Sequence, residues 1–99
     1  MITLIRTAVI APGKTGAALT FSQEVVKLFK EKYGVSVEVF TPVGGNFSRI
    51  AWHSRYENLA QYDAMYTKAM ADKTYWELVS KYSDSFIPGS GLDEIWRGV

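Results

Sequence analysis

The sequence contains no cysteine, and this absence excludes disulfide bonds, thiolate catalysis and metal sites built from cysteine ligands. Its one histidine, His53, also excludes a metal site made of several histidines within one chain. Lysine and arginine (11) nearly balance aspartate and glutamate (10), so the positive charge that neutralises phosphates in most nucleic-acid binders is missing. We therefore expect no metal, no cofactor and no nucleic-acid partner.

Long hydrophobic runs are missing as well. No apolar stretch approaches the roughly 20 residues that a membrane-spanning helix needs. The opening residues MITLIRTAVIAPGK carry Arg6 inside the apolar stretch and have no charged lead-in, which is typical of a strand and not of a signal peptide. A cytoplasmic protein without a membrane partner is the expectation.

What is present suits a small globular protein. The chain has 99 residues, of which 47% are hydrophobic, and it shows no internal repeat or linker, so residues 1–99 should form a single domain. A domain of this size leaves a large share of its surface exposed unless it associates with another molecule. Size alone therefore favours an oligomer.

The first half of the chain predicts a strand, a helix and a second strand. Residues 2–11 are rich in β-branched side chains and end at Pro12-Gly13, a turn signal. Apolar residues recur at helical spacing from about residue 15 to residue 33, and Gly34 supplies a typical C-terminal cap. Residues 35–40 then alternate between apolar and polar side chains, as a strand does.

A loop at residues 42–46 and a third strand follow. Pro42-Val43-Gly44-Gly45-Asn46 is typical of a hairpin connection, because glycine and asparagine accept positive φ at little cost. Residues 47–56 alternate again, and the face that carries Ile50 and Trp52 should pack on the helices.

Two further helical segments and a last strand complete the chain. Asn58 with Gln61 resembles a capping box, which predicts a helix from about Leu59. Residues 70–74 interrupt the apolar stripe, and Thr74 followed by Glu77 repeats the capping pattern, so we predict a break and a new helix through residue 82. Residues 92–99 predict the last strand.

The order βαββαβ predicts an α+β, ferredoxin-like fold, in which two helices cover one face of a four-stranded antiparallel sheet. The other face is expected to carry mixed apolar and ionisable side chains: Arg6, Glu38, Phe40, Arg49, His53 and Trp96 or Arg97. Such a face is too apolar to be bare and too polar for a tight core. We therefore predict a homodimer in which two sheets face each other.

The chain resembles the dimeric α+β barrel superfamily, and within it the NIPSNAP-like proteins and the cofactor-free antibiotic-biosynthesis monooxygenases. The likeness rests on the opening strand ending in APGK, the helix with Phe21 and Phe29, the later segments YDAM and YW, and the closing EIWR. The resemblance implies a homodimer whose sheets enclose a cavity of ligand size. The monooxygenase branch is associated with Asn, Trp, Tyr and Arg side chains in the cavity, and Asn46, Trp52 and Arg49 supply similar residue types.

His53 is the sharpest single candidate for chemistry, because an imidazole titrates near neutral pH and can act as a general base or as an axial haem ligand. It can equally be a hydrogen-bonded histidine in the interior or at the rim. Arg6 and Arg49, with Glu38 on a neighbouring strand, can bind a substrate carboxylate or enolate. They can also form an ion pair that only fixes the strands.

We predict a protein that binds a small, partly aromatic molecule in a cavity enclosed by the sheet. The alternatives are a cofactor-independent monooxygenase-like or haem-handling enzyme, and a structural or interaction module without a ligand. For an enzyme, we predict His53 as the proton acceptor, with Arg6 and Arg49 holding negative charge on a small, partly aromatic substrate. Three further residues, Phe40, Glu38 and Trp96, are expected to contact the ligand.

Overall fold

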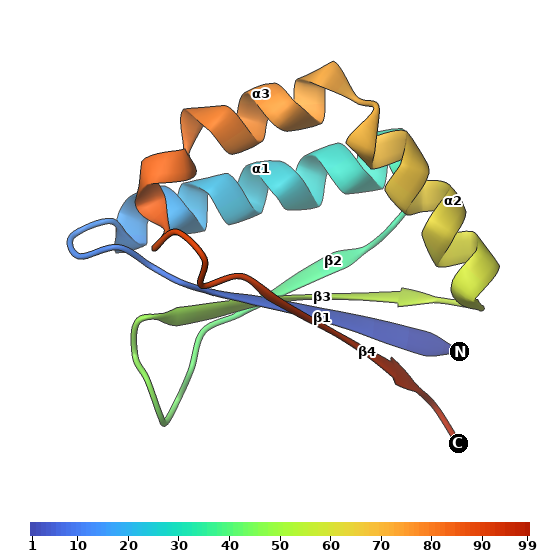
Figure 1. Ribbon diagram of the computed structural model, residues 1–99, viewed down its shortest axis with the longest axis horizontal. Coiled ribbons are helices and arrows are strands. Elements are labelled where there is room, and N and C mark those ends of the chain that lie inside the picture. Colours follow the sequence, from blue (N-terminus) through green and yellow to red (C-terminus); the bar gives the residue numbers. More distant parts are fainter.

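The computed structural model describes residues 1–99 and shows helices covering one face of a four-stranded antiparallel sheet (Figure 1). The strands are β1 (Ile2–Val9), β2 (Val37–Phe40), β3 (Arg49–Tyr56) and β4 (Leu92–Arg97), and they lie in the order β2-β3-β1-β4. The helices are α1 (Thr15–Tyr33), α2 (Leu59–Met70) and α3 (Lys73–Lys81), and a short 3₁₀ helix covers Ser83–Ser85. The predicted ferredoxin-like fold is confirmed, with the second helix divided into α2 and α3.

The core lies between the sheet and the helices. Alternate residues of the two central strands point toward the helices, so Ile2 pairs with Tyr56 and Leu4 pairs with Ser54 across the strands. These four residues are buried, and Met65 of α2 packs against the same cluster. The helix-facing side of β3 that the sequence predicts is therefore confirmed. Burial of such apolar surface stabilises the fold by roughly 25 cal/mol per Å².

The first helix ends as the sequence predicts. Gly34 adopts the left-handed conformation with φ 66°, and its backbone N–H donates to the carbonyl of Phe29. A residue with a Cβ would be strained at this φ, so glycine is the natural choice at the end of α1. The chain then reverses and enters β2, beside β3.

The N-terminal ends of α2 and α3 are capped by side chains. Asn58 Oδ1 accepts a hydrogen bond from the Gln61 backbone N–H at 2.9 Å, which confirms the predicted cap of α2. The predicted break after Met70 is also confirmed. The predicted cap at Thr74 is wrong, because Asp72 caps α3 and its Oδ1 accepts from the Thr74 N–H at 2.9 Å.

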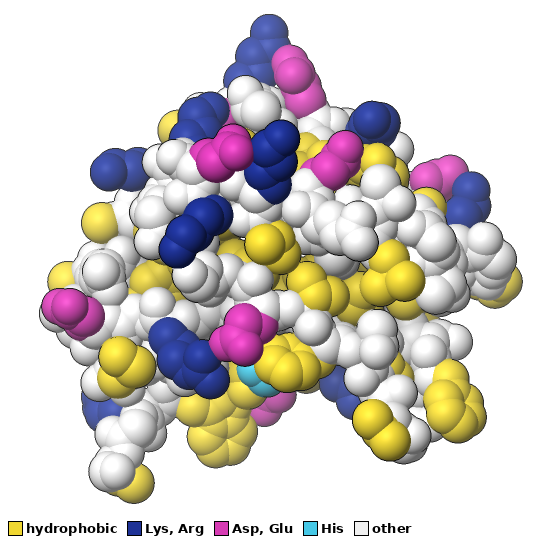
Figure 2. Space-filling model, turned by 180° about the vertical axis from the view of Figure 1, so that it is seen from behind, with side chains coloured by type: hydrophobic (Ala, Val, Ile, Leu, Met, Phe, Trp, Pro, Cys, Tyr) yellow, Lys and Arg dark blue, Asp and Glu magenta, His cyan; other side chains and the backbone are white.

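The face of the sheet turned away from the helices is called the open face here. Cross-strand pairing places Thr7, Ala51, Phe40 and Leu92 in one row of it, since these residues lie opposite one another on adjacent strands. The neighbouring row holds Ile5, His53, Glu38 and Glu94. In Figure 2 the single histidine is visible in the lower part of the molecule, with both hydrophobic and charged side chains beside it.

The predicted position of Arg6 on the open face is wrong. Arg6 lies opposite Trp52 on β3 and Asp93 on β4, so its side chain points to the helix side of the sheet. Arg97 lies opposite Ile2 and shares that side, which leaves Trp96 on the open face. Arg6 is tolerated on the helix side because Asp93 supplies an adjacent carboxylate near the edge of the sheet.

None of the three helices is both long enough and apolar enough to cross a membrane. The cytoplasmic location expected from the sequence stays a prediction.

Candidate functional site

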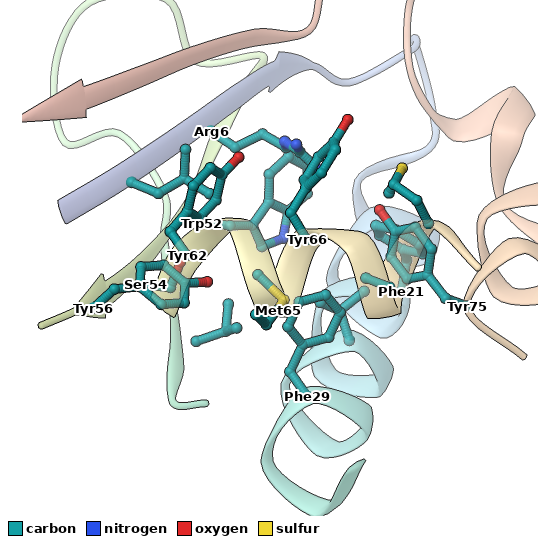
Figure 3. A pocket seen from close by; sticks show the side chains of 15 residues that line it. Arg6, Phe21, Phe29, Trp52, Ser54, Tyr56, Tyr62, Met65, Tyr66 and Tyr75 are labelled. Atoms are coloured by element: carbon teal, nitrogen blue, oxygen red, sulfur yellow. The ribbon is translucent and has the colours of Figure 1, made fainter. Parts of the chain in front are cut away.

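A cavity lies between the helix side of the sheet and the three helices (Figure 3). Its volume is about 90 Å³, and 13 of its 15 lining residues are hydrophobic. The lining residues, which define the helix-side cavity, are Leu4, Arg6, Phe21, Val25, Phe29, Val37, Trp52, Ser54, Tyr56, Tyr62, Met65, Tyr66, Ala69, Met70 and Tyr75. Most ligand pockets have volumes of about 300 Å³ or more, so this cavity is small. Its size suits a single aromatic ring.

Aromatic side chains from four elements, β3 and the helices α1, α2 and α3, form the wall. Trp52 and Tyr56 come from alternate positions of β3, so both point toward the helices. Tyr62 of α2 packs edge-on against Tyr56, with the ring centroids 5.2 Å apart. Phe21 of α1 makes the same kind of contact with Trp52 at 6.1 Å. Edge-to-face contacts of this kind fix the rings and leave flat surfaces for a planar ligand.

The indole nitrogen of Trp52 is already satisfied inside the wall. Trp52 Nε1 donates to Ser22 Oγ at 2.8 Å, and Ser22 Oγ donates to the Ala18 carbonyl at 2.8 Å. This relay anchors Trp52 to α1 and orients its ring. The indole therefore contributes apolar surface to the cavity and leaves polar recognition to other groups.

The Tyr56 hydroxyl is the exception among the buried polar groups of the wall. Tyr56 is only 2% exposed, and its hydroxyl oxygen has no hydrogen-bond partner. Burial raises the pKa of the phenol. The nearby Ser54 hydroxyl offsets part of this rise in the pKa of Tyr56. In Figure 3 the Tyr56 oxygen points into the space that Ser54 and Met65 border.

Arg6 lies at the border of the helix-side cavity, where it forms a bidentate ion pair with Asp93. Its Nε donates to Asp93 Oδ1 at 2.6 Å and its Nη2 donates to Asp93 Oδ2 at 2.8 Å. The hydrogen bond to Asp93 raises the pKa of Arg6. The two side chains are 37% and 39% exposed, so solvent screens the pair, and its main effect is to hold the guanidinium in one orientation.

The lining side chains cannot supply a base at neutral pH. They include no histidine and no carboxylate, and their titratable groups are one arginine and four tyrosines. The phenol of Tyr62 has a raised pKa, mainly because it is buried. The arrangement can therefore enclose an apolar ring and donate hydrogen bonds to it, and it does not offer a proton acceptor.

The structure separates the predicted catalytic residues. His53 and Arg49 lie on the open face, on the opposite side of the sheet from Arg6, so the predicted convergence of all three is wrong. His53 is half-buried, and its ring packs against that of Phe40 in a tilted arrangement, with the centroids 4.4 Å apart and an interplanar angle of 43°. The neighbouring carboxylate, Glu38, accepts from Arg55 Nη1 at 2.7 Å and makes no ion pair with either predicted arginine.

Arg49 lies in a second hollow, next to the β2–β3 loop. This hollow has a volume of about 220 Å³ and includes Phe40, Asn46 and Arg49 in its lining. Arg49 makes no ion pair within the chain.

Of the predicted ligand-contact residues, Phe40 and Glu38 are close to His53, and Trp96 lies across the sheet on β4. No three His, Asp or Glu side chains gather closely enough to hold a metal ion.

The large aromatic residues of this wall, Trp52, Tyr62, Tyr66 and Tyr75, are typical of core and helix packing when only the sequence is considered, and nothing in the sequence singles out Tyr56 itself. The structure places all of them around the helix-side cavity. One signal was available: β3 carries the polar Ser54 between Trp52 and Tyr56 on the side that should be core. Polar atoms on a core-facing strand require partners, so this pattern points to a site.

No family model matches the sequence, and no curated protein matches it significantly. Solved structures do share the fold. A NIPSNAP family protein of unknown function from Agrobacterium tumefaciens strain C58 is 20% identical, with a TM-score of 0.83 over 99% of this chain and 87% of its own.

Two further structures extend the likeness. An uncharacterized NIPSNAP domain protein from Burkholderia xenovorans is 15% identical, with a TM-score of 0.83 over 100% of this chain and 95% of its own. An antibiotic biosynthesis monooxygenase is also 15% identical, with a TM-score of 0.73 over 100% of this chain and 99% of its own. The resemblance stated from the sequence is thus confirmed, and at these identities it describes the fold alone.

Proposed function

We propose that the protein binds a small aromatic molecule in the helix-side cavity and that it works as a homodimer. The observation that carries the binding proposal is the buried Tyr56 hydroxyl, which faces an aromatic-walled cavity without a partner. A buried hydroxyl without a hydrogen bond costs about 1–3 kcal/mol, and a bound molecule with a suitable polar atom would recover that cost. The cavity wall would bury the rest of the ligand.

The lining favours binding over catalysis. The cavity lacks a group that can accept a proton at neutral pH, and His53 lies on the other side of the sheet. The cavity is smaller than most ligand sites, but the flexible side chains Met65 and Met70 form part of its wall and can move to admit a ring. A molecule with a single aromatic ring fits these limits.

The binding proposal is tested by an NMR titration with small aromatic probes such as acetophenone. Backbone amide signals of residues around the cavity, including Ser54 and Tyr62, should shift with a single saturable dependence on the probe. Met70→Trp should fill the cavity and abolish the shifts while the protein stays folded. Shifts confined to the open face, or saturable shifts that persist in Met70→Trp, would place the binding elsewhere and overturn the proposal.

The homodimer would be formed by two open faces. Phe40 is 44% exposed and Trp96 is 59% exposed, and both lie on that face without a covering element. The charges of the face favour a second copy as the partner. Arg49 and Glu94 have no ion-pair partner within the chain, so a two-fold arrangement can bring Arg49 of each copy toward the carboxylate of the other.

The dimer proposal predicts twice the chain mass in sedimentation at micromolar concentration. Phe40→Asp should shift the protein toward the monomer. In the dimer the Phe40 ring would be buried in the interface, and the variant would have to bury a carboxylate at the same place. The matched control is Leu19→Asp on α1, which changes an exposed apolar residue of the helix layer and should leave the mass unchanged. A wild-type monomer, or a dimer that survives Phe40→Asp, is the result that contradicts the proposal.

A further inference from the structure

We propose that Tyr56 determines the ligand specificity of the helix-side cavity, which selects neutral aromatic molecules that carry a hydrogen-bond acceptor such as a carbonyl oxygen. This inference rests on the proposed binding function and goes one step further, because it names the chemistry of the ligand. It follows from three observations on the lining residues: an unpartnered donor, a shortage of acceptors and a neutralised arginine.

The unpartnered donor is the hydroxyl of Tyr56. The residue is 2% exposed, and its buried hydroxyl oxygen has no hydrogen-bond partner within the chain. Figure 3 shows the oxygen directed into the space that Ser54 and Met65 border. Buried polar groups in folded proteins nearly always have partners, so the natural partner here is an atom of the ligand.

The ligand atom that meets Tyr56 should be an acceptor. Burial raises the pKa of this phenol, so the hydroxyl keeps its proton at neutral pH and can donate it. The other polar groups of the wall are also donors or hydroxyl groups, and the only pure acceptors among the lining side chains are the weakly accepting thioether sulfurs of Met65 and Met70. A ligand whose polar edge only donates hydrogen bonds would therefore find fewer partners than one whose polar edge accepts them.

The ligand should also be neutral. Arg6 is the only cation of the wall, and the two carboxylate oxygens of Asp93 occupy its Nε and Nη2 groups. The charge that would attract an anion is therefore already balanced. An anionic ligand would have to give up its hydration on entering a mostly apolar cavity, and this cost is large without a free cation.

The test compares two probes of the same shape and the same number of non-hydrogen atoms. Acetophenone has a carbonyl oxygen where α-methylstyrene has a methylene group. Dissociation constants for both are measured by NMR titration of the wild type and of Tyr56→Phe, which removes only the hydroxyl. We expect Tyr56→Phe to weaken acetophenone about three- to tenfold, the fold-change that corresponds to one neutral hydrogen bond, and not to weaken α-methylstyrene.

The matched control is Tyr82→Phe, which removes a hydroxyl from a tyrosine that does not line the cavity. It should leave both dissociation constants unchanged. If both probes bind and the ratio of their dissociation constants is the same in the wild type and in Tyr56→Phe, the specificity role of Tyr56 is wrong and the binding function stands. If neither probe binds at millimolar concentration, the binding function fails and the specificity with it.

A third probe, benzoate, tests the requirement for a neutral ligand. Benzoate matches acetophenone in size and carries a full negative charge at neutral pH. The inference predicts that it binds at least tenfold more weakly than acetophenone to the wild type, because Asp93 already balances Arg6. Benzoate that binds as tightly as acetophenone would overturn this part of the proposal.

Discussion

The Tyr56 hydroxyl should cost the unliganded protein stability, because the group has left water without gaining a hydrogen bond. Replacing it with phenylalanine keeps the ring and removes the unsatisfied oxygen. We predict that Tyr56→Phe raises the free energy of unfolding in urea by about 1 kcal/mol. Replacing a buried tyrosine with phenylalanine usually destabilises a protein when the tyrosine hydroxyl is hydrogen-bonded. A lower free energy of unfolding for Tyr56→Phe would therefore show that the Tyr56 hydroxyl has a partner.

The ion pair of Arg6 gives a second prediction at the scale of single residues. Asp93→Asn keeps the size of the side chain and removes the carboxylate that balances Arg6. The guanidinium then becomes a free cation at the border of the helix-side cavity. We predict that benzoate binds Asp93→Asn at least several-fold more tightly than the wild type, and that acetophenone binds both about equally. Unchanged binding of benzoate would show that Arg6 does not face the ligand.

These two residues also show where the sequence stops being informative. Each side of β1 mixes apolar and polar side chains, since Ile2, Leu4 and Arg6 alternate with threonines and Ile5, so periodicity does not tell which side faces the helices. The side is fixed by the register with β3 and β4, and Asp93 lies 87 positions away in the sequence. A pairing between residues so far apart depends on the whole fold.

At the scale of elements, the junction of α2 and α3 depends on one carboxylate. Asp72 caps α3 and accepts hydrogen bonds from Lys32 Nζ at 3.0 Å and from the Tyr33 hydroxyl. These bonds, first that of Lys32, hold the pKa of Asp72 at about 2. Burial, followed by the hydrogen bond to Asp72, raises the pKa of Tyr33. The carboxylate thus ties the end of α1 to the start of α3.

This junction should make stability depend on acid pH. The folded pKa of Asp72 lies below the usual value of about 3.9, so its contribution is fully present above pH 4 and is lost as the pH falls toward 2. We predict that Asp72→Asn melts at a lower temperature than the wild type at pH 7. The difference between the two melting temperatures should become smaller at pH 2. Asp63→Asn, on the exposed side of α2, serves as the control and should change neither value. If the melting temperatures of Asp72→Asn and the wild type differ as much at pH 2 as at pH 7, the stabilising role of the Asp72 carboxylate is contradicted.

The elements themselves could be predicted largely from local pattern. Helical spacing with Gly34 located α1, and Asn58 with Gln61 located the start of α2, because these signals lie within a few residues of one another. The cap of α3 was misplaced by two residues, since Thr74 and Asp72 are both good caps. The choice between them depends on Lys32 and Tyr33, which approach Asp72 only in the folded chain.

At the scale of the whole molecule, the fold and the uncovered apolar face could be predicted, and the cavity could not. Alternation along β3 was enough to indicate which face meets the helices. The cavity depends on how far α2 stands from the sheet and on the orientations of large rings, which no single segment encodes. The sequence therefore led to the open face, where His53 lies, and away from the helix side, where the ligand site is proposed.

One consequence concerns β4, the edge strand that carries Asp93. All six of its residues are exposed, and only β1 pairs with it, so local unfolding should begin there. Fraying of β4 would also pull Asp93 away from Arg6 and loosen the border of the cavity. We therefore expect amide hydrogen exchange in β4 to be fast without ligand and to slow when acetophenone is bound. If binding leaves exchange in β4 unchanged, the strand and the cavity open independently, and the rate of ligand release is set elsewhere.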